Sequence, residues 1–375
     1  MIRKNSMWAA VAAGLLSFPA MAEDAAVTAT PTDAPKEVHI PVSATLVPGI
    51  GVNGFASGDV VNNFSLGLVA THAGRLDGVA VATAGNWINR EVRGAQIAAG
   101  FNVAGGKVTG AQITAGVNVA AQDLQGWQIS SGLNVASGDI RGLQASAGVN
   151  VATGDMHGLQ TSAGLSYADK LAGAQISVLN IGGDVDGAQI GIVNIARKVK
   201  GLQLGLLNLS SEMEGAPIGL LSIAGNGQFH VQAYSTDVAL TNVALKFGSK
   251  HVYSLATVGL QPGDAKSRRW YTGLGIGGHI PFGRFYVDID GIASSGGEEL
   301  FWRKDAELLS QLRLIGGFQV APRLSVFGGV TGNVLIEWEN QGGQKPGFDA
   351  APRWETQNAH NRVSIWPGLV AGVQI

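Results

Sequence analysis

The central part of this chain is built from a short repeat, which constrains the fold more than any other feature. A triplet of glycine, an apolar residue and glutamine recurs, and each copy is followed by an asparagine or a serine. The triplets begin at Gly94, Gly110, Gly126, Gly142, Gly158, Gly173, Gly187 and Gly201. Repetition on this scale is typical of proteins in which each unit packs only against its neighbours.

The spacing of the repeat changes along the chain, and the way it changes predicts a coil. From Gly94 to Gly158 the triplets are 16 residues apart, and from Gly173 onward they are 14 apart. One residue is lost before the asparagine and one after it. A coil with two arms and two corners loses residues in this way, and apolar and polar residues alternate within the arms as in β-strands. We therefore predict an all-β fold that begins with a tandem-repeat β-solenoid of 14–16 residues per coil.

In a stack of such coils each residue lies above its counterpart, so the repeated amides are expected to form ladders. At a rise of about 4.8 Å per coil, each amide can donate to one neighbour and accept from the other. A buried amide without a partner would cost about 1–3 kcal/mol. The predicted ladder residues are Gln96, Gln112, Gln128, Gln144, Gln160, Gln175, Gln189, Gln203, Asn102, Asn118, Asn134, Asn150, Asn180, Asn194 and Asn208, with Ser166 and Ser222 in place of asparagine.

An alternative architecture makes each repeat one strand of a single, larger transmembrane barrel. Alternating strands of about ten residues suit a bilayer, and the glutamines and asparagines would then line a channel. Strands running in opposite directions would have to share one sequence and one turn, which argues against this architecture. The larger barrel predicts a pore, whereas the solenoid predicts a rod without a pocket.

The N-terminus has the pattern of a secretory signal peptide. Arg3 and Lys4 precede an apolar stretch from Met7 to Phe18, and Ala20-Met21-Ala22 fits a cleavage site. A membrane anchor is the alternative, but the stretch is shorter than the roughly 20 residues that a spanning helix needs. The predicted domains are a signal peptide at 1–22, a disordered spacer at 23–40, lead-in strands with a degenerate repeat at 41–77, and the tandem repeats at 78–227.

The C-terminal segment, 228–375, loses the repeat and gains aromatic residues. It contains candidate strands joined alternately by short turns and long loops, which is the pattern of outer-membrane barrels. We predict an antiparallel, outer-membrane-type barrel of about eight strands. A soluble sandwich or small barrel with the aromatic residues in its core is the alternative. Residues expected in an aromatic girdle near the strand ends are Tyr271, Phe282, Tyr286, Phe318, Trp338 and Trp366.

The composition argues against several functional classes. The formal net charge is -2, so no basic surface is expected to bind nucleic acid. The chain has no cysteine for disulfides, thiolate metal sites or nucleophilic catalysis. No histidine stands with carboxylates at metal-ligand spacing, and the repeat carries amides where a polysaccharide-cleaving enzyme needs carboxylates. We predict a non-enzyme with no catalytic, metal-binding or cofactor-binding residues and no cofactor.

One repeat unit, Gly187-Ala188-Gln189-Ile190-Gly191-Ile192-Val193-Asn194-Ile195-Ala196, resembles those of a family of bacterial surface-repeat proteins. Members of that family carry tandem G-L-Q-x-G-L-x-N-x-A units. The segments 47–54, 62–66 and 366–372 are similar to the lead-in and last strand of such proteins. The resemblance implies an exported protein of the outer envelope, with a largely uncharacterised role. It supplies no catalytic residues.

These observations predict a non-enzymatic outer-membrane or cell-surface protein with a structural, adhesive or scaffolding role. Outer-membrane lipid is the expected partner, and the sequence does not identify a protein or glycan partner. The alternatives are a pore formed by the larger barrel and a soluble repeat protein in the periplasm or secreted. If a ligand binds, the longest loop is the first place to expect it, because exposed loops on rigid scaffolds carry recognition. The candidate residues there are Arg353, Trp354 and His360.

Overall fold

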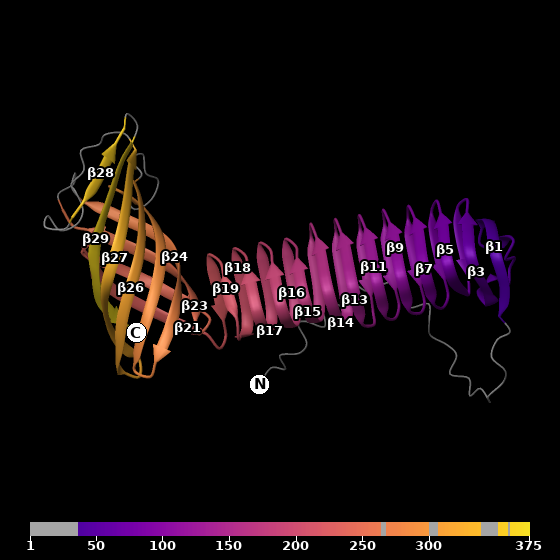
Figure 1. Ribbon diagram of the computed structural model, residues 1–375, viewed down its shortest axis with the longest axis horizontal. Coiled ribbons are helices and arrows are strands. Elements are labelled where there is room, and N and C mark those ends of the chain that lie inside the picture. Colours follow the sequence, from indigo (N-terminus) through magenta and orange to yellow (C-terminus); the bar gives the residue numbers. More distant parts are fainter. Residues whose placement is uncertain (1–36, 264–267, 300–306, 339–351, 359–360) are drawn as a thin grey trace. The chain divides into compact units, whose positions relative to one another are not determined.

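The repeats fold into a parallel β-solenoid whose coils lie side by side in one stack (Figure 1). The computed structural model describes residues 37–263, 268–299, 307–338, 352–358 and 361–375. The predicted signal peptide and nearly all of the predicted spacer lie outside the described residues. Among the residues described, no helix has the length and apolar character needed to cross a bilayer.

Each coil has a first arm, which carries the glutamine in the repeats from Gly94 to Gly201, and a second arm, which carries the asparagine or the residue that replaces it. The first arms are β3 (Val60–Gly67), β5 (Arg75–Ala82), β7 (Val92–Ala98), β9 (Val108–Thr114), β11 (Leu124–Ser130), β13 (Ile140–Ser146) and β19 (Ala216–Ile218). The second arms are β4 (Ala70–Ala73), β6 (Gly85–Ile88), β8 (Phe101–Ala104), β10 (Val117–Ala120), β12 (Leu133–Ala136) and β20 (Leu221–Ala224). Some strands continue from a second arm through the corner that follows it: β14 (Val149–Ser162), β15 (Leu165–Ile176), β16 (Leu179–Ile190), β17 (Val193–Leu204) and β18 (Leu207–Met213).

The strands pair in parallel and in the register of the repeat. Gly126 lies beside Gly110, and Gln128 lies beside Gln112. This pairing confirms the solenoid and contradicts the single larger barrel, in which successive repeats would run antiparallel. The predicted lead-in at 41–77 belongs to the same stack, because β1 (Val38–Val47) pairs in parallel with β3.

The change from long to short coils occurs at two successive corners. Ala152 pairs with Ala168, an offset of 16, whereas Asp155 pairs with Lys170, an offset of 15. Across the next corner the offset falls again, since Leu165 pairs with Leu179. Each corner therefore loses one residue, as the repeat spacing predicts, while the two arms keep their length and their pairing.

The repeat glycines form a column in which the backbones of adjacent coils approach closely. Gly142 has a φ of 144°, and a Cβ placed on it would lie 2.0 Å from the carbonyl oxygen of Gly126. Both the positive φ and the close carbonyl exclude a side chain. The neighbouring column of buried apolar residues is continuous through the stack and includes Leu124, Ile140, Met156, Leu171, Val185, Val199 and Met213.

The first coil is closed by a short structure that precedes β3. The strand β2 (Ile50–Gly51) folds back antiparallel on β1, and the short helix η1 (Ser57–Asp59) follows. Asn53, between them, donates from Nδ2 to Asn62 Oδ1 at 2.7 Å. Asn62 pairs with Leu76 and belongs to neither amide ladder, so Asn53 provides a buried amide of the first coil with a hydrogen bond from outside the repeat.

The C-terminal segment folds into a closed antiparallel barrel of eight strands. They are β21 (Gln228–Thr236), β22 (Thr241–Gly248), β23 (Val252–Gln261), β24 (Arg269–Phe282), β25 (Phe285–Gly297), β26 (Glu307–Ala321), β27 (Leu324–Trp338) and β29 (Asn361–Gln374). Pairing of β21 with β29 closes the barrel, and the short strand β28 (Trp354–Gln357) pairs only with β29. The predicted antiparallel barrel of about eight strands is confirmed, and short and long connections alternate as expected.

Half of the predicted aromatic girdle is wrong. Tyr271, Tyr286 and Trp366 lie inside the barrel and are almost fully buried, whereas Phe282 and Trp338 face outward. Alternate residues of a strand lie on the same face of the sheet, so one buried residue shows which residues of that strand point into the barrel. The sequence showed that these residues lie near strand ends, but it did not show which face they occupy.

The solenoid and the barrel are in contact within the compact unit Val38–Ile375. The hydroxyl of Ser254 on β23 donates to the backbone oxygen of Gly219 at 2.7 Å. Gly219 lies in the last coil, between β19 and β20. The barrel therefore bonds directly to the final turn of the stack.

Replacing one column glycine should destabilise the solenoid strongly. Gly142→Ala adds a methyl group against a backbone carbonyl at a strained φ, so we expect the free energy of unfolding to fall by about 3 kcal/mol or more. Thermal unfolding followed by circular dichroism measures this loss. The control is the exposed neighbour Arg141→Ala, expected within about 0.5 kcal/mol of the parent. Equal effects of the two changes would contradict the role of the column.

Candidate functional site

The glutamines of the repeat point into the coil and bond to their counterparts in adjacent coils. Gln112 Nε2 donates to Gln96 Oε1 at 2.8 Å, and Gln112 Oε1 accepts from Gln128 Nε2 at 2.7 Å. The second N–H of Gln112 donates to the backbone oxygen of Val119 at 3.0 Å. Every predicted ladder glutamine is fully buried. The ladder therefore satisfies groups that would be costly to bury alone.

The asparagines form a second ladder that runs in the opposite direction. Asn118 Nδ2 donates forward to Asn134 Oδ1 at 2.9 Å, whereas Gln128 Nε2 donates backward to Gln112. Asn118 Nδ2 also donates to the backbone oxygen of Ile129 at 2.9 Å. The amide dipoles of the two columns therefore oppose each other, and the stack acquires little net dipole from its side chains.

The asparagine ladder is interrupted where the coils shorten. Ser166 replaces asparagine there, and its hydroxyl lies 2.6 Å from that of Ser177. Asn150 Nδ2 keeps the usual bond to the first arm, at 2.7 Å from the backbone oxygen of Thr161, but its neighbour in the next coil is Ser166. The next ladder begins at Asn180, which donates to Asn194 at 2.8 Å. The hydroxyls of Ser162, Ser166 and Ser177 therefore bond to one another where the coils shorten, and the asparagine ladder is broken between Asn150 and Asn180.

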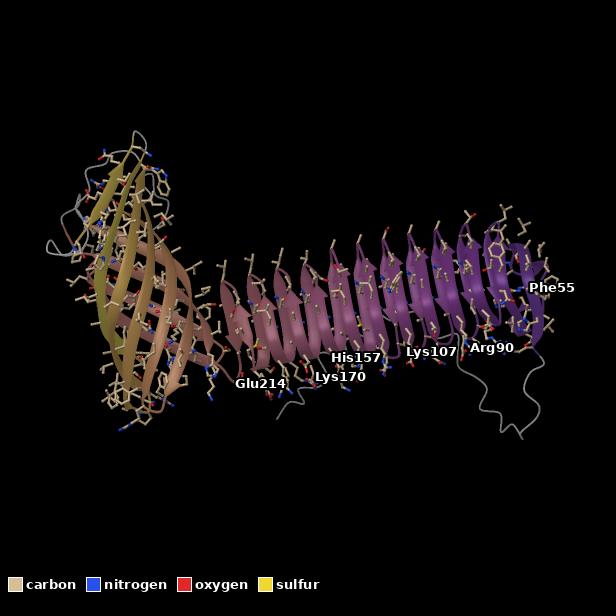
Figure 2. The ribbon with its side chains drawn as sticks, viewed as in Figure 1. Phe55, Arg90, Lys107, His157, Lys170 and Glu214 are labelled. Carbon is tan, nitrogen blue, oxygen red and sulfur yellow. The ribbon has the colours of Figure 1, made fainter. Side chains whose placement is uncertain are left out.

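The charged residues of the coils lie along the corner that follows the second arm. Figure 2 shows Arg90, Lys107, His157, Lys170 and Glu214 along one edge of the stack. In the short coils, charges of opposite sign face each other in consecutive coils. The paired positions in order are Asp155, Lys170, Asp184, Lys198 and Glu212.

This alternation avoids stacking like charges. Lys170 Nζ lies 3.0 Å from Asp155 Oδ1, and Lys198 Nζ lies 2.6 Å from Glu214 Oε1. The hydrogen bond between Lys198 and Glu214 raises the pKa of the ammonium and lowers the pKa of the carboxyl. An amide can bond to a copy of itself, whereas each of these lysines bonds to a carboxylate of an adjacent coil. The charged edge is therefore a solvated structural feature of the coils.

Every lysine, arginine, aspartate and glutamate on the eight barrel strands belongs to one of four ion pairs. All of these residues lie on the same face of their strand as the buried side chains, so they point into the barrel. The pairs are Lys246–Asp288 at 2.5 Å, Arg313–Asp290 at 2.6 Å, Arg269–Glu307 at 3.1 Å and Arg362–Glu337 at 2.7 Å. Four positive and four negative charges therefore balance within the barrel.

Two of these pairs lie at the centre of a continuous polar network. Lys246 and Arg313 have no exposed side-chain surface. Asp288 also contacts His279 Nδ1, at 2.6 Å, and Asp290 accepts a hydrogen bond from the hydroxyl of Tyr253. The barrel interior is thus filled by bonded side chains, as expected for eight strands, whose lumen is only wide enough for side chains.

The outward face of the barrel is apolar. Its exposed large side chains include Val243, Leu245, Val258, Leu274, Ile276, Ile280, Phe282, Phe285, Ile289, Leu312, Leu314, Val326, Val330, Ile365, Leu369 and Val373. We call this set the barrel belt. No charged residue of the eight strands lies on this outward face. The distribution is the reverse of that in a soluble protein, which exposes its charges.

The described part of the predicted recognition loop does not form one surface. Arg353 packs its guanidinium over the ring of Trp366 at 4.8 Å, whereas Trp354 is 63% exposed. His360 lies outside the described residues. Arg353 therefore packs on a buried residue of the barrel, whereas Trp354 is exposed in β28. A binding role for these residues stays a prediction.

Sequence reasoning missed the ion pairs of the barrel. Their members come from strands far apart in the chain, so no local motif contains them. The sequence does contain one indication of buried charge. Asp288 and Asp290 are two residues apart in an apolar strand, so both carboxylates lie on the same face of it.

Within the described ranges, no group of three or more histidine and acidic residues is placed to hold a metal ion. No family model matches the chain, and neither a curated protein nor a solved structure matches it.

Breaking the glutamine ladder in its interior should cost more than breaking it at its end. Gln144→Leu leaves Gln128 Oε1, an N–H of Gln160 and the backbone oxygen of Val151 unpaired. We expect a loss of about 3–5 kcal/mol in the free energy of unfolding, measured by chemical denaturation followed by circular dichroism.

The matched control is Gln203→Leu at the last rung, where Pro217 occupies the next position. Gln203 donates only to Gln189 among the described contacts, and its own Oε1 has no partner there. The expected loss is about 1–2 kcal/mol. Equal losses at the two positions would show that stacking of the amides adds nothing.

Removing one member of a buried ion pair should destabilise the barrel more than neutralising both. Arg313→Leu leaves Asp290 as an uncompensated buried charge, and we expect a loss of about 3–5 kcal/mol. Adding Asp290→Asn removes that charge and retains an acceptor for Tyr253, so part of the loss should be recovered. Urea unfolding in detergent micelles measures both variants. A double variant less stable than Arg313→Leu alone would refute this account.

Proposed function

We propose that this chain is a non-enzymatic protein of the bacterial outer membrane, anchored by its C-terminal barrel, with the β-solenoid as a rigid structural or scaffolding element. The supporting observation is the inversion of charge in the barrel. Its four ion pairs point inward and the barrel belt is apolar. In water this arrangement would expose a continuous apolar surface, whereas in a bilayer it places hydrocarbon against hydrocarbon.

The same observation favours the membrane anchor over a soluble secreted protein. A soluble barrel buries aromatic residues and exposes charges, but here the charged side chains of the strands occupy the interior. Buried charges are tolerated when each is paired and hydrogen-bonded, and all eight are paired. The resemblance of the repeats to bacterial surface-repeat proteins supports the same location.

The filled interior favours an anchor over a channel. Lys246, Arg313, Tyr253 and Leu255 have at most 1% of their surface exposed, and they occupy the lumen at the level of the barrel belt. An open pore would need a solvated interior at this level.

A structural role for the solenoid follows from how its polar groups are used. The amides bond to one another in the ladders, and ion pairs between adjacent coils join Lys170 to Asp155 and Lys198 to Glu212 and Glu214. Each interior coil pairs along both arms with the coils on either side of it, so the stack is held along its whole length by contacts between neighbouring coils. An adhesive role toward a protein or glycan is compatible with the exposed faces, and no residue set in the described chain identifies such a partner.

Cell fractionation tests the location directly. We expect the protein in the outer-membrane fraction, extracted by detergent and not by high salt. The folded barrel should also migrate differently on a gel before and after boiling, because a closed barrel resists detergent until heated. Recovery of the protein from the culture medium without detergent would refute the proposal.

A charge placed on the barrel belt should impair membrane insertion. Val330→Arg puts a cation on the outward face, with an expected cost of about 2–4 kcal/mol at the bilayer midplane. The yield of heat-modifiable protein in lipid vesicles measures insertion. Thr356→Arg, on the exposed strand β28 outside the eight barrel strands, is the control and should insert normally. If Val330→Arg inserts equally well, the belt does not face lipid.

A further inference from the structure

The corner between the first and second arms changes character in the short coils. In the long coils it consists of small residues, as in Ala115-Gly116 and Ala147-Gly148. In the short coils one residue is lost, and a large apolar side chain occupies the corner. These residues are Val178, Ile192, Leu206 and Leu220, each between 47% and 55% exposed. We call them the tip row.

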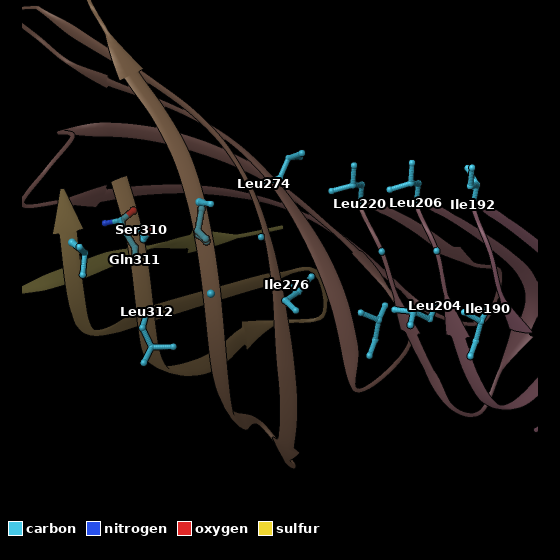
Figure 3. A pocket seen from close by; sticks show the side chains of 18 of the residues that line it. Ile190, Ile192, Leu204, Leu206, Leu220, Leu274, Ile276, Ser310, Gln311 and Leu312 are labelled. Carbon is cyan, nitrogen blue, oxygen red and sulfur yellow. The ribbon is translucent and has the colours of Figure 1, made fainter. Parts of the chain in front are cut away.

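Exposed apolar residues flank the tip row. Ile176, Leu204 and Ile218 come from the adjacent positions of the first arm and are 36–42% exposed. Figure 3 shows Ile192, Leu206 and Leu220 in one row, with Ile190 and Leu204 beside it. Four consecutive coils therefore present an apolar ridge that has no covering element among the described residues.

Charge is absent from this ridge and concentrated on the opposite corner. The segments 187–196 and 201–211 contain no charged residue, and the charges that separate them are Arg197, Lys198 and Lys200. Each short coil thus has a charged edge and an apolar edge. Segregation of this kind is typical of surfaces that lie between water and hydrocarbon.

The ridge is continuous with the barrel belt. A groove of 1210 Å³ is lined on one side by the ridge and on the other by barrel residues that include Leu274, Ile276 and Leu312. Its only polar side chains are those of Ser310 and Gln311, and Figure 3 shows the two sets of residues that line it. Three of its lining residues belong to the barrel belt, so the groove opens onto the surface that the proposed function places in lipid.

We propose that the tip row is a lipid-contacting edge, and that acyl chains of the bilayer around the barrel fill the groove. This inference rests on the proposed membrane anchor and extends it to the solenoid. The four short coils would contact the hydrocarbon along Val178, Ile192, Leu206 and Leu220. The long coils, with alanine, serine and glycine at the same corner, would not.

Because the chain has no cysteine, single-cysteine variants can carry a nitroxide label at chosen positions. The full chain is reconstituted in vesicles of phosphatidylcholine and phosphatidylglycerol. The collision rates of the label with oxygen, which partitions into lipid, and with a water-soluble nickel chelate are measured by electron paramagnetic resonance. The test positions are Leu206→Cys and Ile192→Cys, which are exposed and should tolerate the label.

Three control positions define the scale. Val330→Cys reports on the barrel belt. Lys200→Cys reports on the charged edge, which is the corner opposite the tip row. Ala147→Cys reports on the corner of a long coil that corresponds to the tip row. We expect the ratio of oxygen to nickel collisions at Leu206 and Ile192 to match that at Val330. It should be several-fold higher than at Lys200 and Ala147.

The other outcomes separate the two proposals. A lipid-exposed label at Val330 with water-exposed labels at Leu206 and Ile192 would overturn the inference and leave the membrane anchor intact. A water-exposed label at Val330 would overturn both. Labels at Leu206 shielded from both reagents, with spin coupling between molecules, would show that a second copy covers the ridge and would overturn the lipid contact.

Discussion

Parallel stacking in register is the constraint on which the solenoid depends, because it places each buried residue against copies of itself. A side chain can occupy such a column only if it bonds to or packs against the residue at the same position of the next coil. Amides meet this condition, since each offers a donor and an acceptor, and apolar groups meet it by dispersion. Charged groups need other partners: in the short coils they lie beside charges of opposite sign, and at the exposed corner of the long coils Asp123 and Asp139 accept from backbone N–H groups. Gln112 therefore has glutamine on both sides, whereas Lys170 and Lys198 have acidic neighbours in the adjacent coils.

The barrel strands also alternate between two faces, but they place their charged side chains differently from the coils. Its antiparallel strands bring unlike residues together, so opposite charges can meet across the interior without any repeat. The charges accordingly lie inside and the apolar residues outside. In the coils the charges lie outside, along one corner. The two domains thus differ in which face of the strand is polar, and this difference is what favours a bilayer around the barrel and water around the charged edge of the coils.

The features that repeat in sequence were predictable, and those that depend on distant partners were not. The triplet spacing predicted the coil, its two arms and the loss of one residue at each corner, because an in-register stack converts sequence period directly into geometry. The strand count of the barrel followed from its alternating connections. The inward orientation of Tyr271 and Trp366 could not be predicted, because the face of a strand that points into the barrel is known only once the strand is paired with its neighbours. Nor did the pairing of Lys246 with Asp288, which lie on strands that are not neighbours in sequence.

Each coil is stabilised by the coils on either side of it. The two end coils lack one of these neighbours and therefore need other contacts. At the start, Asn53 bonds to Asn62 from outside the repeat, and β2 folds over part of β1. At the end, Pro217 and Ser222 replace the ladder amides, so fewer buried groups are left without a partner, and Ser254 of the barrel bonds to Gly219 in the last turn. Exposed strand edges invite pairing with other chains. The barrel therefore caps the edge at which the repeat would otherwise continue, so the array has a fixed length.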